Sequence, residues 1–103
     1  MPERYRIIIT PRASADLQDI HQYIEKDSPQ NATSVAGEII KAIDSLEIFP
    51  LRYRVYKGRK QPSEAVRRMP VPPFLIYYRV QEEHLAVDII TIRHGARRPP
   101  RDL

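Results

Sequence analysis

The sequence contains no cysteine, and none of its apolar runs approaches the length that crosses a membrane. The missing cysteine excludes disulfide bonds, thiolate metal sites and cysteine nucleophiles, and it fits a reducing compartment. The apolar run near the N-terminus, residues 7–9, is too short for a signal peptide. We therefore expect a soluble, cytoplasmic protein without a membrane partner.

The sequence also lacks internal repeats, low-complexity stretches and linker-like segments. Its 103 residues have room for one domain with one core. We expect a single domain over residues 1–103, of which residues 99–103 form a loose tail.

Charge is distributed unevenly along the chain, although the formal net charge is only +4. Residues 1–50 carry five basic and eight acidic side chains, whereas residues 51–103 carry twelve basic and five acidic ones. This division predicts an acidic face and a basic face, and the basic face would attract a polyanion or an acidic partner. A basic surface that is merely solvated is the alternative.

Two helices are predicted in the first half of the chain. Apolar residues recur at helical spacing over residues 12–27 and again, in a wider stripe, up to residue 46. Each helix is preceded by a capping residue and a proline, Thr10-Pro11 and Ser28-Pro29. Phe49-Pro50 ends the second helix, because the residue before a proline is disfavoured in helical geometry. The short joint predicts an antiparallel helical hairpin.

Strands are predicted before and after these helices. Residues 4–10 and 65–69 alternate apolar and polar side chains. Residues 74–80 and 85–93 are rich in Val, Ile, Tyr and Phe, and a short polar link joins them into a hairpin. The apolar phase of the last run shifts at Ile89-Ile90, which indicates a strand buried on both faces or a β-bulge. The predicted order is strand, helix, helix and three strands.

Basic residues gather in two places. Residues 51–61 interleave five Lys and Arg with Tyr53 and Tyr56, a mixture that binds nucleic acid or packs a loop on a sheet edge. The last strand ends in a second cluster, Arg93-His94-Gly95-Ala96-Arg97-Arg98. A buried strand holds such a cluster rigidly, which suits a working site.

The sequence resembles the RelE/ParE superfamily of toxins from bacterial toxin–antitoxin pairs. The resemblance spans nearly the whole chain: an opening strand, a helix with the pattern A-x-x-x-L-x-x-I from Ala13, then Tyr77-Tyr78-Arg79-Val80 and Ile92-Arg93-His94-Gly95-Ala96-Arg97. It implies an α+β fold of the order β-α-α-β-β-β, with a helical hairpin on one face of a small, mostly antiparallel sheet. It also implies an antitoxin partner, acidic, with a ribbon–helix–helix DNA-binding domain and a disordered tail.

Two activities compete within that superfamily. The His-Gly-Ala-Arg ending resembles ParE-like members, for which the resemblance implies binding and poisoning of DNA gyrase. The alternative is a RelE-like, ribosome-dependent mRNA endoribonuclease. A toxin fold without activity is a third possibility. Neither of the two activities calls for a cofactor or a metal.

Site residues follow from the two activities. A nuclease needs cations on the transition state and a proton-transfer group; Arg67, Arg79 and Arg93 would supply the cations, and His94 or Tyr78 would move the proton. Strand parity opposes a single site, because Tyr78 and Arg79 point to opposite faces, as do Arg93 and His94. For target or antitoxin binding, the candidates are Arg67, Tyr78, Arg79, Arg93, His94 and Arg97.

Overall fold

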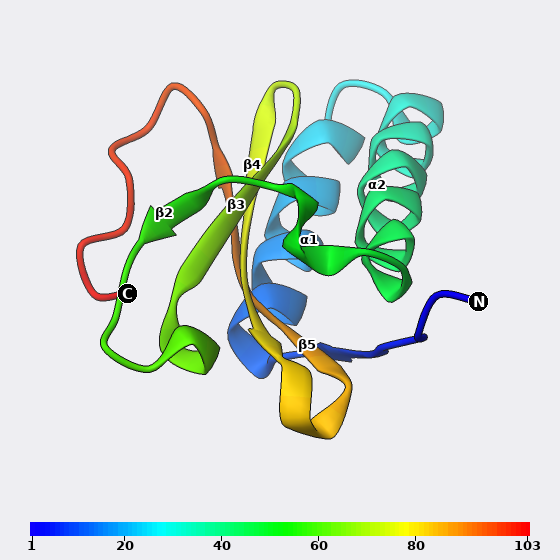
Figure 1. Ribbon diagram of the computed structural model, residues 1–103. Coiled ribbons are helices and arrows are strands. Elements are labelled where there is room, and N and C mark those ends of the chain that lie inside the picture. Colours follow the sequence, from blue (N-terminus) through cyan, green and yellow to red (C-terminus); the bar gives the residue numbers. More distant parts are fainter.

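A five-stranded sheet carries two helices on one of its faces in the computed structural model, which describes residues 1–103 (Figure 1). None of the helices has the length and apolar character needed to cross a membrane. The elements are β1 (Arg6–Ile9), α1 (Pro11–Glu25), α2 (Pro29–Asp44), β2 (Val55–Lys57), β3 (Val66–Val71), β4 (Phe74–Gln81) and β5 (Ala86–His94).

The strand order is β1-β5-β4-β3-β2, so β5 lies inside the sheet and β1 and β2 lie at its edges. All neighbouring pairs are antiparallel except β1 and β5, which run parallel with Arg6 opposite Ala86. The predicted α+β class and mostly antiparallel sheet are confirmed. The structure adds one short strand, β2, within the segment where the sequence shows no periodicity.

Both predicted helix starts are confirmed by their capping bonds. The hydroxyl oxygen of Thr10 accepts from the main-chain N–H of Ala13 at 3.2 Å, and that of Ser28 accepts from Asn31 at 3.2 Å. A proline follows each cap, where its missing N–H leaves no donor unpaired. Thr10 also donates its hydroxyl to the carbonyl of Ile89 at 2.8 Å. The first turn of α1 is thereby fixed to β5.

Both alternatives for the phase shift at Ile89-Ile90 are seen, since β5 carries a β-bulge there and is buried on both faces. Ile89 pairs with Tyr78 and Thr91 pairs with Tyr77, so Ile90 has no partner on β4. The bulge turns Ile90 into the face opposite the helices, while Ile89 stays in the helix-side core. Beyond the end of β1, the carboxylate of Asp16 on α1 accepts from the N–H of Ile92 at 3.0 Å and from the Thr91 hydroxyl. Asp16 therefore satisfies the part of β5 that β1 leaves unpaired.

The two faces of the sheet bury different clusters. We call the helix-covered side the inner face and the other side the outer face. The inner cluster contains twelve buried residues: Ala13, Ile39, Ile43, Leu46, Met69, Phe74, Ile76, Tyr78, Val80, Val87, Ile89 and Ile92. The outer cluster contains only four: Val66, Tyr77, Ile90 and Leu103. The main core thus lies between the sheet and the helical hairpin.

Residues 99–103, expected to be a loose tail, are instead folded onto the outer face (Figure 1). Leu103 is only 5% exposed. The guanidinium of Arg59 donates to its main-chain oxygen at 2.6 Å, and Arg12 on α1 forms an ion pair of 2.7 Å with Asp102. The prediction rested on the segment's place at the chain terminus, whereas Leu103 covers apolar surface that the helices do not reach.

Candidate functional site

The six residues predicted to form a site lie in three separate places. Cross-strand partners share a face of the sheet, so the register assigns each side chain to one side. Arg67 and Tyr78 form one pair on the inner face, and His94 lies opposite inner-face Phe74. Arg79 and Arg93 belong to the outer face, and Arg97 follows the end of β5.

Arg67 and Tyr78 hold the segment that leads from α2 to β2. The guanidinium of Arg67 donates to the carbonyl oxygens of Leu51, at 3.1 Å, and Tyr53, at 2.7 Å. The Tyr78 hydroxyl donates to the carbonyl of Pro50 at 2.6 Å. Because Tyr78 is completely buried, it does not belong to an exposed binding face, which corrects its place among the candidates.

Burial raises the pKa of Tyr78 to about 12, although the positive charges of Arg67 and Arg52 act in the opposite direction. Its hydroxyl therefore stays protonated at neutral pH, and its proton is committed to the Pro50 carbonyl. This environment suits a structural hydrogen bond and does not suit proton transfer to a substrate.

Arg79 and Arg93 are half-buried on the outer face. The Nε of Arg79 donates to the carbonyl of Glu64 at 3.2 Å, and Arg79 lies across from Asp88 on β5. Arg93 lies across from Leu75, and its charge helps Arg12 to hold the pKa of the Asp102 carboxyl below its usual range. Both arginines thus face the side that residues 99–103 partly cover.

His94 and Arg97 belong to the turn that follows β5. The His94 Nδ1 accepts from the N–H of Ala96 at 3.0 Å, and its ring meets that of Phe74 edge-on, with centroids 5.6 Å apart. Gly95 donates its N–H to the Pro73 carbonyl at 2.7 Å, and a Cβ on Gly95 would lie only 3.1 Å from that oxygen. Any larger residue would crowd that carbonyl, so glycine suits this close approach. The Arg97 side chain is exposed.

Strand parity thus predicted correctly that these residues would not converge. Arg67 and Tyr78 act on one main-chain segment, Arg79 and Arg93 face the other way, and His94 supports a turn. No group of three or more His, Asp or Glu side chains is placed to hold a metal ion.

The sequence analysis did not predict the exposed, strained segment at residues 48–55, which we call the Phe49 loop. Phe49 has φ 51° and ψ 53°, a left-handed conformation that a bulky aromatic residue seldom adopts, and its side chain is 65% exposed. Leu51 and Val55 are also exposed, at 41% and 42%. The pair Phe49-Pro50 indicated only that a helix ends, and no residue type there signals positive φ.

Hydrogen bonds from three side chains fix the main chain of this loop. Besides the bonds from Arg67 and Tyr78, Arg52 donates to the Ile48 carbonyl at 2.6 Å and to the Phe49 carbonyl at 3.0 Å. An open hollow of about 560 Å³ lies beside it. Its lining consists of Met1, Pro2, Glu3, Tyr5, Phe49, Pro50, Leu51 and Arg52.

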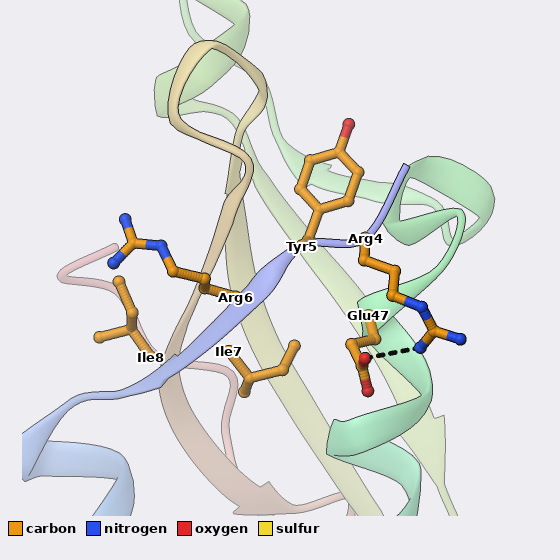
Figure 2. A pocket seen from close by; sticks show the side chains of 6 residues that line it. All are labelled: Arg4, Tyr5, Arg6, Ile7, Ile8 and Glu47. Atoms are coloured by element: carbon orange, nitrogen blue, oxygen red, sulfur yellow. Dashed lines mark hydrogen bonds and ion pairs between the residues drawn. The ribbon is translucent and has the colours of Figure 1, made fainter. Parts of the chain in front are cut away.

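A second open hollow, of about 590 Å³, runs along β1 (Figure 2). Arg4 and Glu47 close one side of it with an ion pair of 2.8 Å, and the Arg6 side chain points away from that pair (Figure 2). Ile8 and Ile9 are 40% and 43% exposed. Since β1 pairs only with β5, its other edge offers main-chain groups to a further strand.

Comparisons with known proteins agree with the fold. Residues 7–99 match the family model of the ParE toxin of the type II toxin–antitoxin system parDE. A putative toxin, Y4kP of Sinorhizobium fredii, is 33% identical over 97% of this chain and 98% of its own length. Toxin RelE2 of Caulobacter vibrioides is 37% identical over 89% of this chain and 97% of its own.

Solved structures share the architecture at lower identity. The chromosomal ParDE system of P. aeruginosa includes a chain that superimposes with a TM-score of 0.68 at 21% identity, over 88% of this chain and 96% of that one. An archaeal RelE–RelB complex from Pyrococcus horikoshii gives 0.65 at 17% identity, over 92% and 99%. With the family match covering most of its residues, this chain belongs to the ParE toxin family of type II toxin–antitoxin systems, within the RelE/ParE superfamily.

Proposed function

We propose that this toxin inhibits growth by binding DNA gyrase and that a cognate antitoxin neutralises it. The observation that carries the proposal is the separation of the candidate nuclease residues, in a chain that matches the ParE family model. A nuclease needs a proton acceptor, a proton donor and cations around a single phosphate. Here the Tyr78 hydroxyl is enclosed, and the cations face opposite sides of the sheet.

The test compares two activities of the purified toxin. We expect it to inhibit supercoiling of relaxed plasmid by DNA gyrase. Adding the antitoxin should restore the supercoiling activity of gyrase. Cleavage of mRNA on translating ribosomes should be absent. Codon-dependent cleavage of mRNA together with undisturbed gyrase would contradict the proposal and favour the RelE-like activity.

Within this proposal, Arg93 and Arg97 contribute to the surface that meets the target or the antitoxin tail. The forked guanidinium matches a carboxylate or phosphate in a way that lysine does not. Arg97 is exposed, whereas Arg93 is half-buried near Asp102. We expect Arg97→Glu to lower toxicity with an unchanged melting temperature. If Arg93→Glu and Arg97→Glu both stay folded, toxic and tightly bound by the antitoxin, this cluster is only a solvated surface.

The antitoxin is proposed to be an acidic polypeptide that binds through an amphipathic helix and an extended segment. The free edge of β1, with exposed Ile8 and the unpaired Arg6, suits an extended acidic segment that adds a strand. We expect Ile8→Glu to weaken antitoxin binding and Val55→Glu, equally exposed at the opposite edge, to leave it unchanged. A stable, non-toxic monomer obtained in high yield without any antitoxin would contradict this partner.

A RelE-like endoribonuclease is the second candidate, favoured by the outer face. The guanidinium of Arg68 lies 5.1 Å from the centre of the Tyr56 ring, and Arg79 and Arg93 share that face. Such a basic and aromatic surface binds single-stranded RNA. His94 lies opposite inner-face Phe74, so it would have to reach the RNA from the strand end. If it moves a proton, His94→Gln should lower mRNA cleavage by at least about a hundredfold without loss of stability. Unchanged toxicity of His94→Gln would remove the residue from any catalytic role.

A further inference from the structure

The Phe49 loop combines three features in one surface segment. Its aromatic side chain is 65% exposed, the backbone of Phe49 is left-handed, and hydrogen bonds from Arg67 and Tyr78 fix the main chain. Glycine or asparagine would adopt φ 51° with less strain. This phenylalanine is held there against its backbone preference, although most of its side chain stays exposed and belongs to neither core cluster.

The other left-handed residue of the chain, Leu85, provides a contrast. Its side chain is half-buried, and its carbonyl accepts from the N–H of Arg6 at 2.7 Å, which ties β1 to the turn between β4 and β5. The strain at Leu85 therefore has a role in the fold itself. At Phe49 the main-chain carbonyl also accepts hydrogen bonds, but the side chain contributes to no core cluster.

We propose that the Phe49 loop is a preformed docking surface whose ring enters an apolar cleft, bordered by carboxylates, on the folded protein that the toxin inhibits. Leu51 and Val55 would lie at the edge of that cleft. The proposal rests on the proposed function only in that the toxin acts by binding a protein.

The charges around the loop define the border of the cleft. The guanidinium of Arg52 donates to main-chain carbonyls, and that of Arg54 is exposed. Neither forms an ion pair with a carboxylate of the chain. Of the two nearby acids, Glu47 is already paired with Arg4, and Glu3 lines the hollow beside the loop. Two guanidinium groups against one carboxylate leave the border of the apolar patch with a net positive charge, which complements an acidic rim.

The rigidity of the loop favours a folded partner over a flexible one. A disordered segment adapts to the surface that it meets, so its binding requires no strained knob on the toxin. A folded cleft has a fixed shape, and a side chain presented in one position enters it at a lower entropic cost. An aromatic residue at the centre of such a contact commonly dominates its affinity.

The experiment compares Phe49→Ala and Phe49→Gly with Tyr23→Ala, which removes the 74% exposed ring of Tyr23 on α1. Binding of purified toxin to DNA gyrase, binding to the antitoxin, melting temperature and toxicity in cells are measured for each variant. We expect both Phe49 variants to bind gyrase at least about tenfold more weakly and Tyr23→Ala to bind normally. Phe49→Gly should melt at the same temperature as the original toxin or higher, because glycine relieves the left-handed strain.

The outcomes separate this inference from the proposed target. If the unchanged toxin does not bind gyrase, the proposed function fails. The role of the loop is then tested by the toxicity of the variants in cells alone. Loss of toxicity in Phe49→Ala but not in Tyr23→Ala supports the docking surface for another target. Full toxicity and full target affinity in folded Phe49→Ala overturn the inference. So does a loss of affinity that is confined to the antitoxin.

Discussion

The inner face of the sheet packs against two helices, whereas the outer face is covered by one irregular segment that ends at Leu103. Neighbouring tyrosines show the contrast. Tyr78 on the inner face donates to the Pro50 carbonyl at 2.6 Å, while the hydroxyl of Tyr77 on the outer face is buried without a partner. No buried side-chain N or O atom on the inner face lacks a hydrogen-bond partner, whereas the outer face has one such atom and is closed by apolar contact and a few polar anchors.

The difference between the faces has an energetic meaning. In a close-packed core between layers of regular structure, each side chain touches many neighbours. Truncating one residue there removes many contacts at once and lowers the stability of the whole fold. A cover formed by an irregular segment can be lifted locally at a cost below that of global unfolding. The outer face is thus the side of the molecule on which local opening is expected, and the following changes test that comparison.

The largest effect is expected from truncating one leucine-sized side chain on each face. Ile43→Ala, within the helix-side core, should lower the free energy of unfolding by about 3–4 kcal/mol, and Leu103→Ala by about 2 kcal/mol. Chemical denaturation measures both. The comparison also predicts that Leu103→Ala speeds amide hydrogen exchange only in the segment that covers the outer face and in its immediate contacts. An equal loss of stability in the two variants would contradict it.

Tyr78→Phe should lower stability by about 1–2 kcal/mol, because it removes a buried hydrogen bond and leaves the Pro50 carbonyl without a donor. The same variant should loosen the Phe49 loop, which heteronuclear NMR would detect as increased motion of residues 49–53. A stability equal to that of the unchanged protein would show that water replaces the hydroxyl.

Alkaline pH provides an independent test of Tyr78. Its folded-state pKa is raised to about 12, above the ordinary value of 10.0. Above pH 10 the unfolded chain loses this proton while the folded protein keeps it, so stability falls as the pH rises toward 12. The contribution is fully present below pH 10. Tyr78→Phe should therefore show a weaker loss of stability in this range than the unchanged protein.

Tyr77→Phe reverses the expectation for Tyr78. The Tyr77 hydroxyl is buried without a hydrogen-bond partner, so its removal should leave stability unchanged or raise it by about 1 kcal/mol. The edge-on contact with the Tyr56 ring, at 5.0 Å between centroids, is kept by phenylalanine. A clear loss of stability would mean that the hydroxyl has a partner in solution.

The smallest effect is expected from Arg12→Ala, which removes the ion pair with Asp102. Both side chains are substantially exposed, so solvent screens the pair and the loss should be about 0.5 kcal/mol or less. The change should be further reduced in high salt. A much larger effect would show that this one pair, and not Leu103, holds the segment on the outer face.

Much of the fold could be predicted because its signals are local. Thr10-Pro11 and Ser28-Pro29 fix the helix starts, and the phase shift at Ile89-Ile90 marks the bulge. The parallel pairing of β1 with β5 carries no local signal, and the short β2 lacks a period that would reveal it.

The site was harder to predict than the fold. Alternation along the strands correctly separated Arg79 from Tyr78, and Arg93 from His94. It could not show that Tyr78 and Arg67 donate their hydrogen bonds to main-chain carbonyls of the loop before β2. Nor does any residue type signal that Phe49 is left-handed, because the loop is fixed by side chains that are distant in the sequence.

The pairing of β1 with β5 also determines when a newly made chain can fold. Arg6 can pair only after Ala86 has been made, because these two residues are partners in the sheet. The entropic cost of closing the long chain segment between them precedes the stabilising contacts, so folding is slow and cooperative. During synthesis, β1 and the helical hairpin leave the ribosome with no sheet to cover their apolar sides. The toxin surface is therefore assembled in one late step, once β5 has emerged, and a chain interrupted before that strand cannot be toxic by this fold.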